Sequence, residues 1–456
     1  MEKKEYRGHV LAVPYPAQGH INPLLQFCKR LDSKGFKATL AISTFIANSN
    51  SFADPTATVH LETISDGFDD GGFAQAESIT AYHSAFEAAG SKSLTHLVRK
   101  HADSDHPINC IVYDSFMPWA LDVAKQQGTL AATFFTQAVA LGCIYYRVNS
   151  GLLRLPISSP PVEIPGLPPL EIGDMPGYVS RPAEYPVYFE MILEQYSNVD
   201  EADFILVNSF YELEAEAVDS MQNLLPMLTI GPTIPSQYLD NRVDGDKTYG
   251  LSLLDQSAPA TNWLATKPPG SVVYISFGSM ASLHDLQTQE LAWGLMASNS
   301  YFLWVTRSSE PESELPRDFV ERTRDKGLFV NWCQQLEVLA NEAVGCFVSH
   351  CGWNSILEAL SLGVRVVAMP LWTDQTTNAK LVEDVWGVGV RVKADDEGLM
   401  GRDEIEACIS RVMVGEEGRK MKANAKRWSD LAKKAVSEGG SSDKNIDEFV
   451  SKFASS

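Results

Sequence analysis

The feature that most constrains the fold is a regular alternation of short, apolar, β-branched runs with amphipathic helical patterns. Apolar runs that alternate with helices are typical of parallel strands covered by helices on both faces. The pattern therefore predicts an α/β fold with two doubly wound parallel sheets. The expected strands are residues 9–15, 37–44, 59–65, 109–115, 130–136 and 204–210 in the first half, and 272–278, 302–306, 328–332, 346–350, 364–370 and 389–393 in the second.

A polar, turn-rich segment at 236–250 lies between the two sets of strands, and we predict that it links two domains. A chain of 456 residues is long enough for two domains of about 200 residues each. A proline-rich stretch at 155–177 interrupts the alternation and is predicted to be a long loop beside a ligand cleft. The expected parts are a first domain at 1–240, a linker at 236–250, a second domain at 251–435 and a helical segment at 436–456.

The formal net charge of −21 argues against nucleic acid and anionic membranes as partners. An anionic nucleotide would therefore have to be held by local backbone dipoles. The seven cysteines are scattered and never form a CxxC pair, which fits a reducing compartment rather than a disulfide framework or a zinc site. The apolar run at the N-terminus ends at Pro14, and the longest one, Leu130 to Tyr146, contains polar residues. We therefore expect a cytoplasmic protein without a signal peptide or membrane insertion.

The densest group of unusual residues lies between Trp332 and Gln375. The run CFVSH at 346–350 is predicted to be a buried strand, and CGWN to turn into a helix that begins near Asn354 and Ser355. A glycine turn before a helix offers free N–H groups and a positive dipole end, which suits a diphosphate. The hydroxyl of Ser355 and the ring of His350 could add further donors.

Three further positions of this segment suit the other parts of a nucleotide sugar. Glu358, one turn into the helix, could accept hydrogen bonds from both ribose hydroxyls. Trp332, at the end of its strand, offers a flat face on which a base could stack. Asp374 and Gln375 follow another strand at its carboxyl end and could bind sugar hydroxyls. Each aromatic residue and histidine of the segment could instead be an ordinary core residue, but their joint spacing favours a binding site.

His20 and Asp114 are the candidates for catalysis. Transfer of a sugar to a hydroxyl or carboxyl group requires a base near neutral pH, and a neutral imidazole is well matched to that task. His20 follows the first strand, and we expect a helix to begin at about Asn22 or Pro23, whose positive end would keep the imidazole neutral. Asp114 ends the strand at 109–115 and could orient the ring if that strand lies beside the first. The alternative is that both residues only cap helices.

The segment from 332 to 375 resembles the signature box of plant secondary-product UDP-glycosyltransferases, an inverting, metal-independent family with the GT-B fold of two Rossmann-like domains. The resemblance extends from GHVLAVPYPAQGHINPLLQF at 8–27 to GGSSDKNIDEFV at 439–450. The residues that stand at the spacing of the box are Trp332, Gln335, His350, Gly352, Trp353, Asn354, Ser355, Glu358, Asp374 and Gln375.

The resemblance implies a role for each part of the box. Trp332 would stack on uracil and Gln335 would help to hold the uridine. His350, Asn354 and Ser355 would face the phosphates and Glu358 the ribose, while Trp353, Asp374 and Gln375 would face the sugar. A glutamine at the end of the box is associated in the family with a preference for glucose. The resemblance also gives His20 and Asp114 their catalytic roles, and implies donor contacts from the Gly278-Ser279 turn and from Thr136.

The acceptor pocket should be apolar with few polar groups, and we name Phe116, Trp372 and Tyr188 as its candidate residues. The resemblance implies UDP-glucose as co-substrate, no metal or other cofactor, and a monomer. Near relatives within the family glucosylate salicylate and other carboxylates, steroids, triterpenoids and phenolics. The sequence therefore leaves the acceptor open, and with it the choice between a glucoside and a glucose ester.

Two positions depart from the pattern of the family. Arg365 stands where the family normally has proline, so it restores an N–H donor and adds a charge beside a buried strand, and we expect it to loosen the turn. Cys333 and Gln334 replace the commoner small residue and proline after the tryptophan, which affects the loop geometry only.

The sequence contains a motif of a metal site and part of a motif of a dinucleotide site, and a third alternative is a protein without turnover. Asp244-Gly245-Asp246 has the spacing of a metal site used by another glycosyltransferase class, but in the linker it is better interpreted as a solvated turn. Gly387-Val388-Gly389 lacks the third glycine of a dinucleotide fingerprint, which argues against a nicotinamide oxidoreductase. A nucleotide-sugar-binding protein without turnover remains the alternative to an enzyme, although such a protein would not need both His20 and Asp114.

Overall fold

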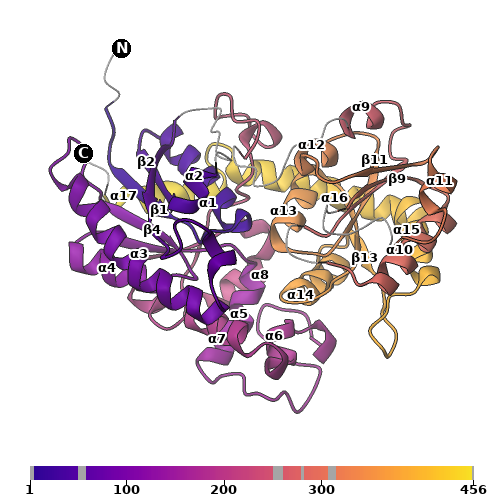
Figure 1. Cartoon of the computed structure of the whole chain (residues 1–456), viewed down its shortest axis with the longest axis horizontal. Helices are drawn as coiled ribbons and strands as arrows, with labels where there is room; N and C mark the ends of the chain where they lie inside the picture. Colours follow the sequence, from indigo (N-terminus) through magenta and orange to yellow (C-terminus); the bar gives the residue numbers. More distant parts are fainter. Residues whose placement is uncertain (1–4, 50–57, 250–259, 279–281, 307–314, 454–456) are drawn as a thin grey trace.

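A computed structural model describes residues 5–49, 58–249, 260–278, 282–306 and 315–453. The chain forms two parallel sheets in two halves that lie side by side, with helices on both faces (Figure 1). The first sheet has the order β3-β2-β1-β4-β5-β6-β7, with strands β1 His9–Val13, β2 Lys37–Ser43, β3 His60–Ile64, β4 Cys110–Asp114, β5 Leu130–Phe135, β6 Phe204–Val207 and β7 Leu228–Thr229. The second has the order β10-β9-β8-β11-β12-β13, with strands β8 Val272–Ser276, β9 Tyr301–Val305, β10 Gly327–Val330, β11 Val344–Ser349, β12 Arg365–Ala368 and β13 Gly389–Arg391.

The helices alternate with these strands and end at recognisable signals. For example, Gly128 and Gly363 follow α4 and α13 in the left-handed conformation, which glycine adopts without strain. In the described part of the chain, no helix has the length and apolar character needed to cross a membrane. The α-helices of the first half are α1 Gln18–Ser33, α2 Thr44–Asn48, α3 Ile79–Ala102, α4 Trp119–Gln127, α5 Val139–Asn149, α6 Gly177–Ser180, α7 Pro186–Glu194 and α8 Tyr211–Met221. The later ones are α9 Ala260–Leu264, α10 Asp285–Ser298, α11 Phe319–Thr323, α12 Gln335–Leu339, α13 Trp353–Leu362, α14 Gln375–Lys380, α15 Arg402–Met413, α16 Gly415–Val436 and α17 Ser441–Ser451.

The predicted strands are all present at nearly the expected positions, and the predicted fold class is confirmed. Strand β7 was not predicted, because two residues carry no periodic signal. The expected start of the first helix near Asn22 or Pro23 is wrong, since α1 begins at Gln18. The chain turns into this helix before Gly19, so His20 lies in the first turn of the helix and not ahead of it.

The order of the strands reverses at one point in each sheet, between β1 and β4 in the first and between β8 and β11 in the second. In doubly wound sheets, ligands bind beyond the carboxyl ends of the strands at this switch point. His20 follows β1, and Asp114 ends β4. In the second sheet, Gly278 follows β8 and His350 follows β11. The candidate catalytic and phosphate-binding residues therefore lie at the two switch points.

The proline-rich loop is bound to the second half of the molecule. Its residue Gly177 donates its N–H to the carbonyl of Thr373, with 2.7 Å between the nitrogen and the oxygen. The buried carboxylate of Asp174 lies 2.7 Å from the guanidinium of Arg391 and 3.4 Å from the ammonium of Lys380. The loop thus connects the first half to the segment that carries Asp374 and Gln375.

The linker contains a buried ion pair with α1. The Nζ atom of Lys29 lies 2.9 Å from Oδ1 of Asp246, and the exposed fractions of the two side chains are 0% and 2%. The interpretation of Asp244-Gly245-Asp246 as a solvated turn is therefore wrong for Asp246. This contact could not be predicted from the sequence, because Lys29 and Asp246 are 217 positions apart.

The end of the chain returns to the first half. Helix α16 extends from the second half toward the first, and α17 packs against the first sheet near β7 (Figure 1). Ile446, Phe449 and Val450 belong to the same buried cluster as Phe27 of α1. Each fully buried side chain of this size contributes about 1.5–3 kcal/mol, so this contact is a substantial part of the core of the first half.

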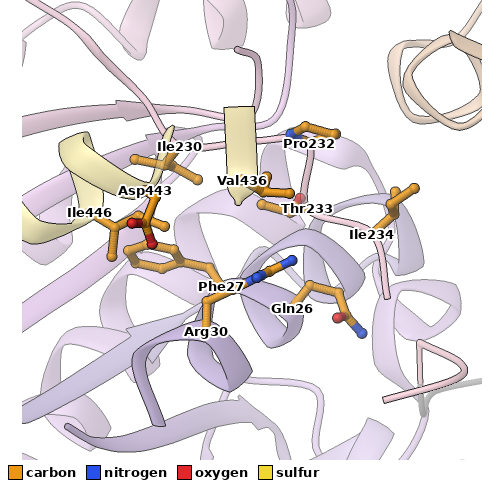
Figure 2. Close-up of a pocket in the computed structure, with 10 residues that line it drawn as sticks. All are labelled: Gln26, Phe27, Arg30, Ile230, Pro232, Thr233, Ile234, Val436, Asp443 and Ile446. Carbon is orange, nitrogen blue, oxygen red and sulfur yellow. The ribbon is translucent and has the colours of Figure 1, made fainter. Parts of the chain in front are cut away.

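A small cavity of about 10 Å³ lies where α1, α17, the end of α16 and residues 230–234 after β7 meet (Figure 2). This volume holds about one water molecule. Arg30 and Asp443 supply charged groups to an otherwise mostly apolar wall. None of the candidate catalytic or donor-binding residues lines this cavity, so it belongs to the packing of the tail.

Candidate active site

His20 and Asp114 are in direct contact. The Nδ1 atom of His20 lies 2.7 Å from Oδ2 of Asp114, whose side chain is fully buried. The other oxygen, Oδ1, accepts the N–H of Phe116 at 3.0 Å. The hydroxyl of Thr136 lies 3.2 Å from His20 Nδ1. A carboxylate beside Nδ1 favours the tautomer that carries its proton there, so Nε2 is the nitrogen with a free lone pair for a substrate proton.

The first turn of α1 is joined to the helix of the predicted donor site. Pro23 lies inside α1 and has no N–H to donate to the carbonyl of Gly19, four residues earlier. That carbonyl instead accepts a hydrogen bond of 2.7 Å from Nδ2 of Asn354. The structure therefore links the backbone next to His20 to the start of α13, across the boundary between the two halves. The amide nitrogen of Asn354, expected to face phosphate, is engaged in this link.

Helix α13 begins at Trp353, directly after Gly352, one residue before the predicted position. Its first turn directs N–H groups toward the switch point of the second sheet, as expected for a phosphate site. A Cβ atom built on Gly352 would lie 2.4 Å from Nε2 of His350, and one on Gly278 would lie 2.8 Å from Cε1 of the same ring. The two glycines are thus required for the close packing of the His350 ring. Ser279, predicted beside Gly278, lies outside the described residues.

Two turns of the second half carry non-glycine residues in the left-handed backbone region. Cys351, between β11 and α13, has a φ of 66°, and Thr373, before α14, has a φ of 60°. This conformation is strained for residues other than glycine and is concentrated at functional sites. Both turns lie at the carboxyl ends of strands where the donor was predicted to bind.

Glu358 lies at the centre of a buried polar network. Its Oε2 atom accepts a hydrogen bond of 2.6 Å from Nε2 of Gln335, which also lies 3.0 Å from the hydroxyl of Ser355. Its Oε1 atom accepts one of 2.8 Å from the hydroxyl of Tyr249 in the linker. Burial raises the pKa of the Glu358 carboxyl to about 7, and the bonds from Gln335 and Tyr249 act in the opposite direction. Tyr249 was not identified from the sequence, because it lies outside the box and only the fold brings it there.

Asp374 is half-buried and Gln375 is buried at the start of α14. The carboxylate of Asp374 accepts hydrogen bonds from the hydroxyl of Thr373 at 2.6 Å and from Nδ2 of Asn378 at 2.8 Å, while its burial raises its pKa. The Oε1 atom of Gln375 accepts the N–H groups of Leu371 and Trp372 at 2.9 and 3.2 Å. These bonds hold the turn and fix the orientation of both side chains.

The two tryptophans of the box have different surroundings. Trp332 follows β10 and is partly exposed, whereas Trp353 is buried and donates its Nε1–H to the carbonyl of Asn208 at 2.7 Å. The indole of Trp353 therefore connects the two halves. The backbone N–H of Trp353 is the group that remains to bind a nucleotide sugar.

The candidate acceptor residues fall into two aromatic groups. Phe116 lies beside His20, with 5.1 Å between the ring centroids, and Tyr15 lies against both rings. Tyr188 and Trp372 contact each other at 5.8 Å, as part of a group that also contains Tyr178 and Tyr185. The structure brings the last two predicted residues together and places Phe116 with the catalytic pair. The aromatic-rich sequence at 178–189 was the signal for Tyr178 and Tyr185.

Two doubly wound halves, with a histidine and a carboxylate at one switch point and a glycine turn before a helix at the other, are typical of a glycosyltransferase of the GT-B fold. The chain belongs to the plant secondary-product UDP-glycosyltransferases. Residues 255–436 match the family described as UDP-glucoronosyl and UDP-glucosyl transferase. The chain is 53% identical to the flavonol 7-O-beta-glucosyltransferase UGT74F1 of Arabidopsis thaliana, over 99% of both chains. It is 46% identical to mogroside I-E synthase of Siraitia grosvenorii, again over 99% of both.

The fold agrees with that of a solved relative. The crystal structure of Os79 from O. sativa in complex with UDP superposes with a TM-score of 0.92 and is 40% identical, over 98% of this chain and 100% of that one. The predicted family, GT-B fold and enzyme class are thus confirmed. The protein is a UDP-glycosyltransferase, and its donor is a UDP-sugar.

Proposed function

We propose that this enzyme transfers glucose from UDP-glucose to a hydroxyl group of a small lipophilic acceptor, such as a phenolic, steroid or triterpenoid, with inversion and without a metal. The contact between His20 and Asp114 carries this proposal. His20 Nε2 would take the proton of the acceptor hydroxyl as its oxygen attacks the anomeric carbon, and Asp114 would stabilise the imidazolium that forms. The C–O bond to the diphosphate breaks in the same displacement, so an α-linked donor yields a β-glucoside and UDP.

The donor would be held by the residues of the box. Trp332 would stack on uracil beside Gln335, Glu358 would accept the ribose hydroxyls, and the amides at the start of α13 would bind the diphosphate with Ser355. The helix dipole would stabilise the charge that develops on the leaving UDP. His350, Gly352 and Asn354 would shape the phosphate site, while Trp353, Asp374, Gln375 and Thr136 would adjoin the glucose. Gln375 supports the choice of glucose through the tendency of its family.

The acceptor would lie between the two aromatic groups, near Phe116, Trp372 and Tyr188. The 53% identity to a flavonol 7-O-beta-glucosyltransferase supports a phenolic hydroxyl as the acceptor group. We also propose a cytoplasmic monomer in which residues 1–240 bind the acceptor and residues 251–435 the donor, connected by 236–250, with 436–456 packed on the first domain. The seven cysteines are all buried, and their scattered positions in the sequence support a reducing compartment.

The test compares the wild type with His20→Ala, using UDP-glucose and a panel of flavonol, steroid, triterpenoid and salicylate acceptors read by mass. Removal of the base should lower the rate with hydroxyl acceptors by about 100- to 10,000-fold and leave UDP binding intact. A carboxylate acceptor is already ionised, so transfer to salicylate, giving an ester, should be reduced much less. Rapid transfer to a weakly acidic alcohol by His20→Ala would contradict the assignment of the base. Binding of UDP without turnover on any acceptor would favour a nucleotide-sugar-binding protein.

A further inference from the structure

The hydroxyl of Tyr249 binds the carboxylate that the proposed function assigns to ribose. It donates to Oε1 of Glu358 at 2.8 Å, while Gln335 donates to Oε2 at 2.6 Å. The ring of Tyr249 packs on an apolar cluster that includes Leu336 and Val436. The phenol is therefore fixed by packing on its ring and by a hydrogen bond at its hydroxyl.

The position of Tyr249 is determined by the first half of the molecule. Lys29 of α1 donates to Asp246 Oδ1 at 2.9 Å and to the carbonyl of Thr248 at 3.3 Å. These contacts fix the linker immediately before Tyr249. Glu358 belongs to α13 in the second half. The bond between the two side chains is thus a contact from the linker, anchored on one half, to the donor site of the other.

The hydrogen bonds from Tyr249 and Gln335 leave acceptor positions on the Glu358 carboxylate for a ribose. Each carboxylate oxygen can accept two hydrogen bonds. Tyr249 uses one position on Oε1 and Gln335 one on Oε2, so one position on each oxygen remains, which matches the two ribose hydroxyls. A buried carboxylate tends to become protonated, and the protonated form could accept from one hydroxyl only. Two donors aimed at the ionised form oppose that tendency.

We propose that Tyr249 is a positioning residue of the donor site, which acts through Glu358 by keeping its carboxylate ionised and oriented toward the ribose hydroxyls. This inference rests on the proposed binding of the ribose by Glu358. Tyr238 and Tyr274 also face Glu358, and burial raises the pKa of Tyr238 to about 12 and that of Tyr274 well above its usual value. Both phenols stay neutral near pH 7, so they add no charge to the site.

The test measures the binding of UDP and 2′-deoxy-UDP by calorimetry at pH 8 to the wild type and to Tyr249→Phe. The wild type should bind 2′-deoxy-UDP about tenfold more weakly than UDP, because the deoxy ligand lacks one hydrogen bond to the charged carboxylate. Tyr249→Phe should bind UDP less tightly than the wild type does. The ratio of its dissociation constants for 2′-deoxy-UDP and UDP should fall to about threefold or less. Tyr238→Phe removes a hydroxyl from the same linker and the same apolar cluster, and should keep the ratio of the wild type.

Three results would overturn the inference. Equal weakening of both ligands would make Tyr249 a structural part of the linker, and tighter UDP binding would mean that its hydroxyl obstructs the ribose. In Glu358→Gln, a further drop in the ratio on adding Tyr249→Phe would show that Tyr249 does not act through Glu358. Failure of the wild type to bind UDP would instead contradict the proposed function itself.

Discussion

Binding of the donor nucleoside should depend on pH through Glu358. Burial raises the pKa of this carboxyl to about 7, and ribose binding needs the ionised form. For a pKa near 7, about nine tenths of the groups are ionised at pH 8 and about one tenth at pH 6. The apparent dissociation constant scales inversely with the competent fraction, so binding should weaken about tenfold between pH 8 and pH 6.

Uridine is the ligand of choice for this measurement, because the terminal phosphate of UDP itself titrates near pH 6. Its dissociation constant is measured by calorimetry from pH 6 to pH 8 for the wild type and Glu358→Gln. The glutamine variant should bind about tenfold more weakly at pH 8, because hydrogen bonds to a charged group are lost, and its affinity should not change with pH. An unchanged affinity of the wild type over this range, or an equal slope in both proteins, would refute the role of Glu358.

Three further predictions concern stability and the connection of the halves. Asp246→Asn leaves the buried ammonium of Lys29 without this carboxylate and should lower the free energy of unfolding in urea by about 3–5 kcal/mol. The double variant Lys29→Met/Asp246→Leu should restore only part of this loss, because it also removes the acceptor of the Ser236 N–H. A loss below about 1 kcal/mol in the single variant would contradict burial of the pair. Arg365→Met removes hydrogen bonds to the carbonyls of three segments and should destabilise the protein by about 2–3 kcal/mol in the same assay, with unchanged UDP affinity. Asp174→Asn weakens the contact with Arg391, which holds the proline-rich loop on the second half, so kinetic assays should show a severalfold higher KM for the acceptor. An effect on kcat alone would contradict this role of the loop.

The strands and the doubly wound class of the two sheets could be predicted from the sequence, because short apolar runs that alternate with amphipathic helical patterns are typical of parallel sheets. The placement of His20 beside Asp114 also followed from local reasoning, because His20 comes shortly after β1 and Asp114 ends β4, the strand that pairs with β1. The start of α1 was misplaced because Pro23 normally marks a first helical turn. Here it lies one turn further in, and the carbonyl that it leaves unpaired binds Asn354 of the other half.

Contacts between distant segments could not be predicted. Asp246 reads as part of a polar turn, and only the position of Lys29 shows that it is buried. Arg365 was expected to loosen its turn, but its guanidinium donates to the carbonyls of Gly345 and Val412 and so holds segments together. Tyr249 is an ordinary linker residue until the fold places it on Glu358. In each case the side chain gains its role from a partner at a large sequence separation.

The return of α17 to the first half affects how the protein is made. Phe27 and Phe204 contact Phe449, which the ribosome adds only after the whole second half. During translation the first half therefore exposes part of its apolar cluster while the second half is synthesised. A stop codon between α16 and α17 should yield an aggregation-prone product, although every residue of the candidate active site would be present.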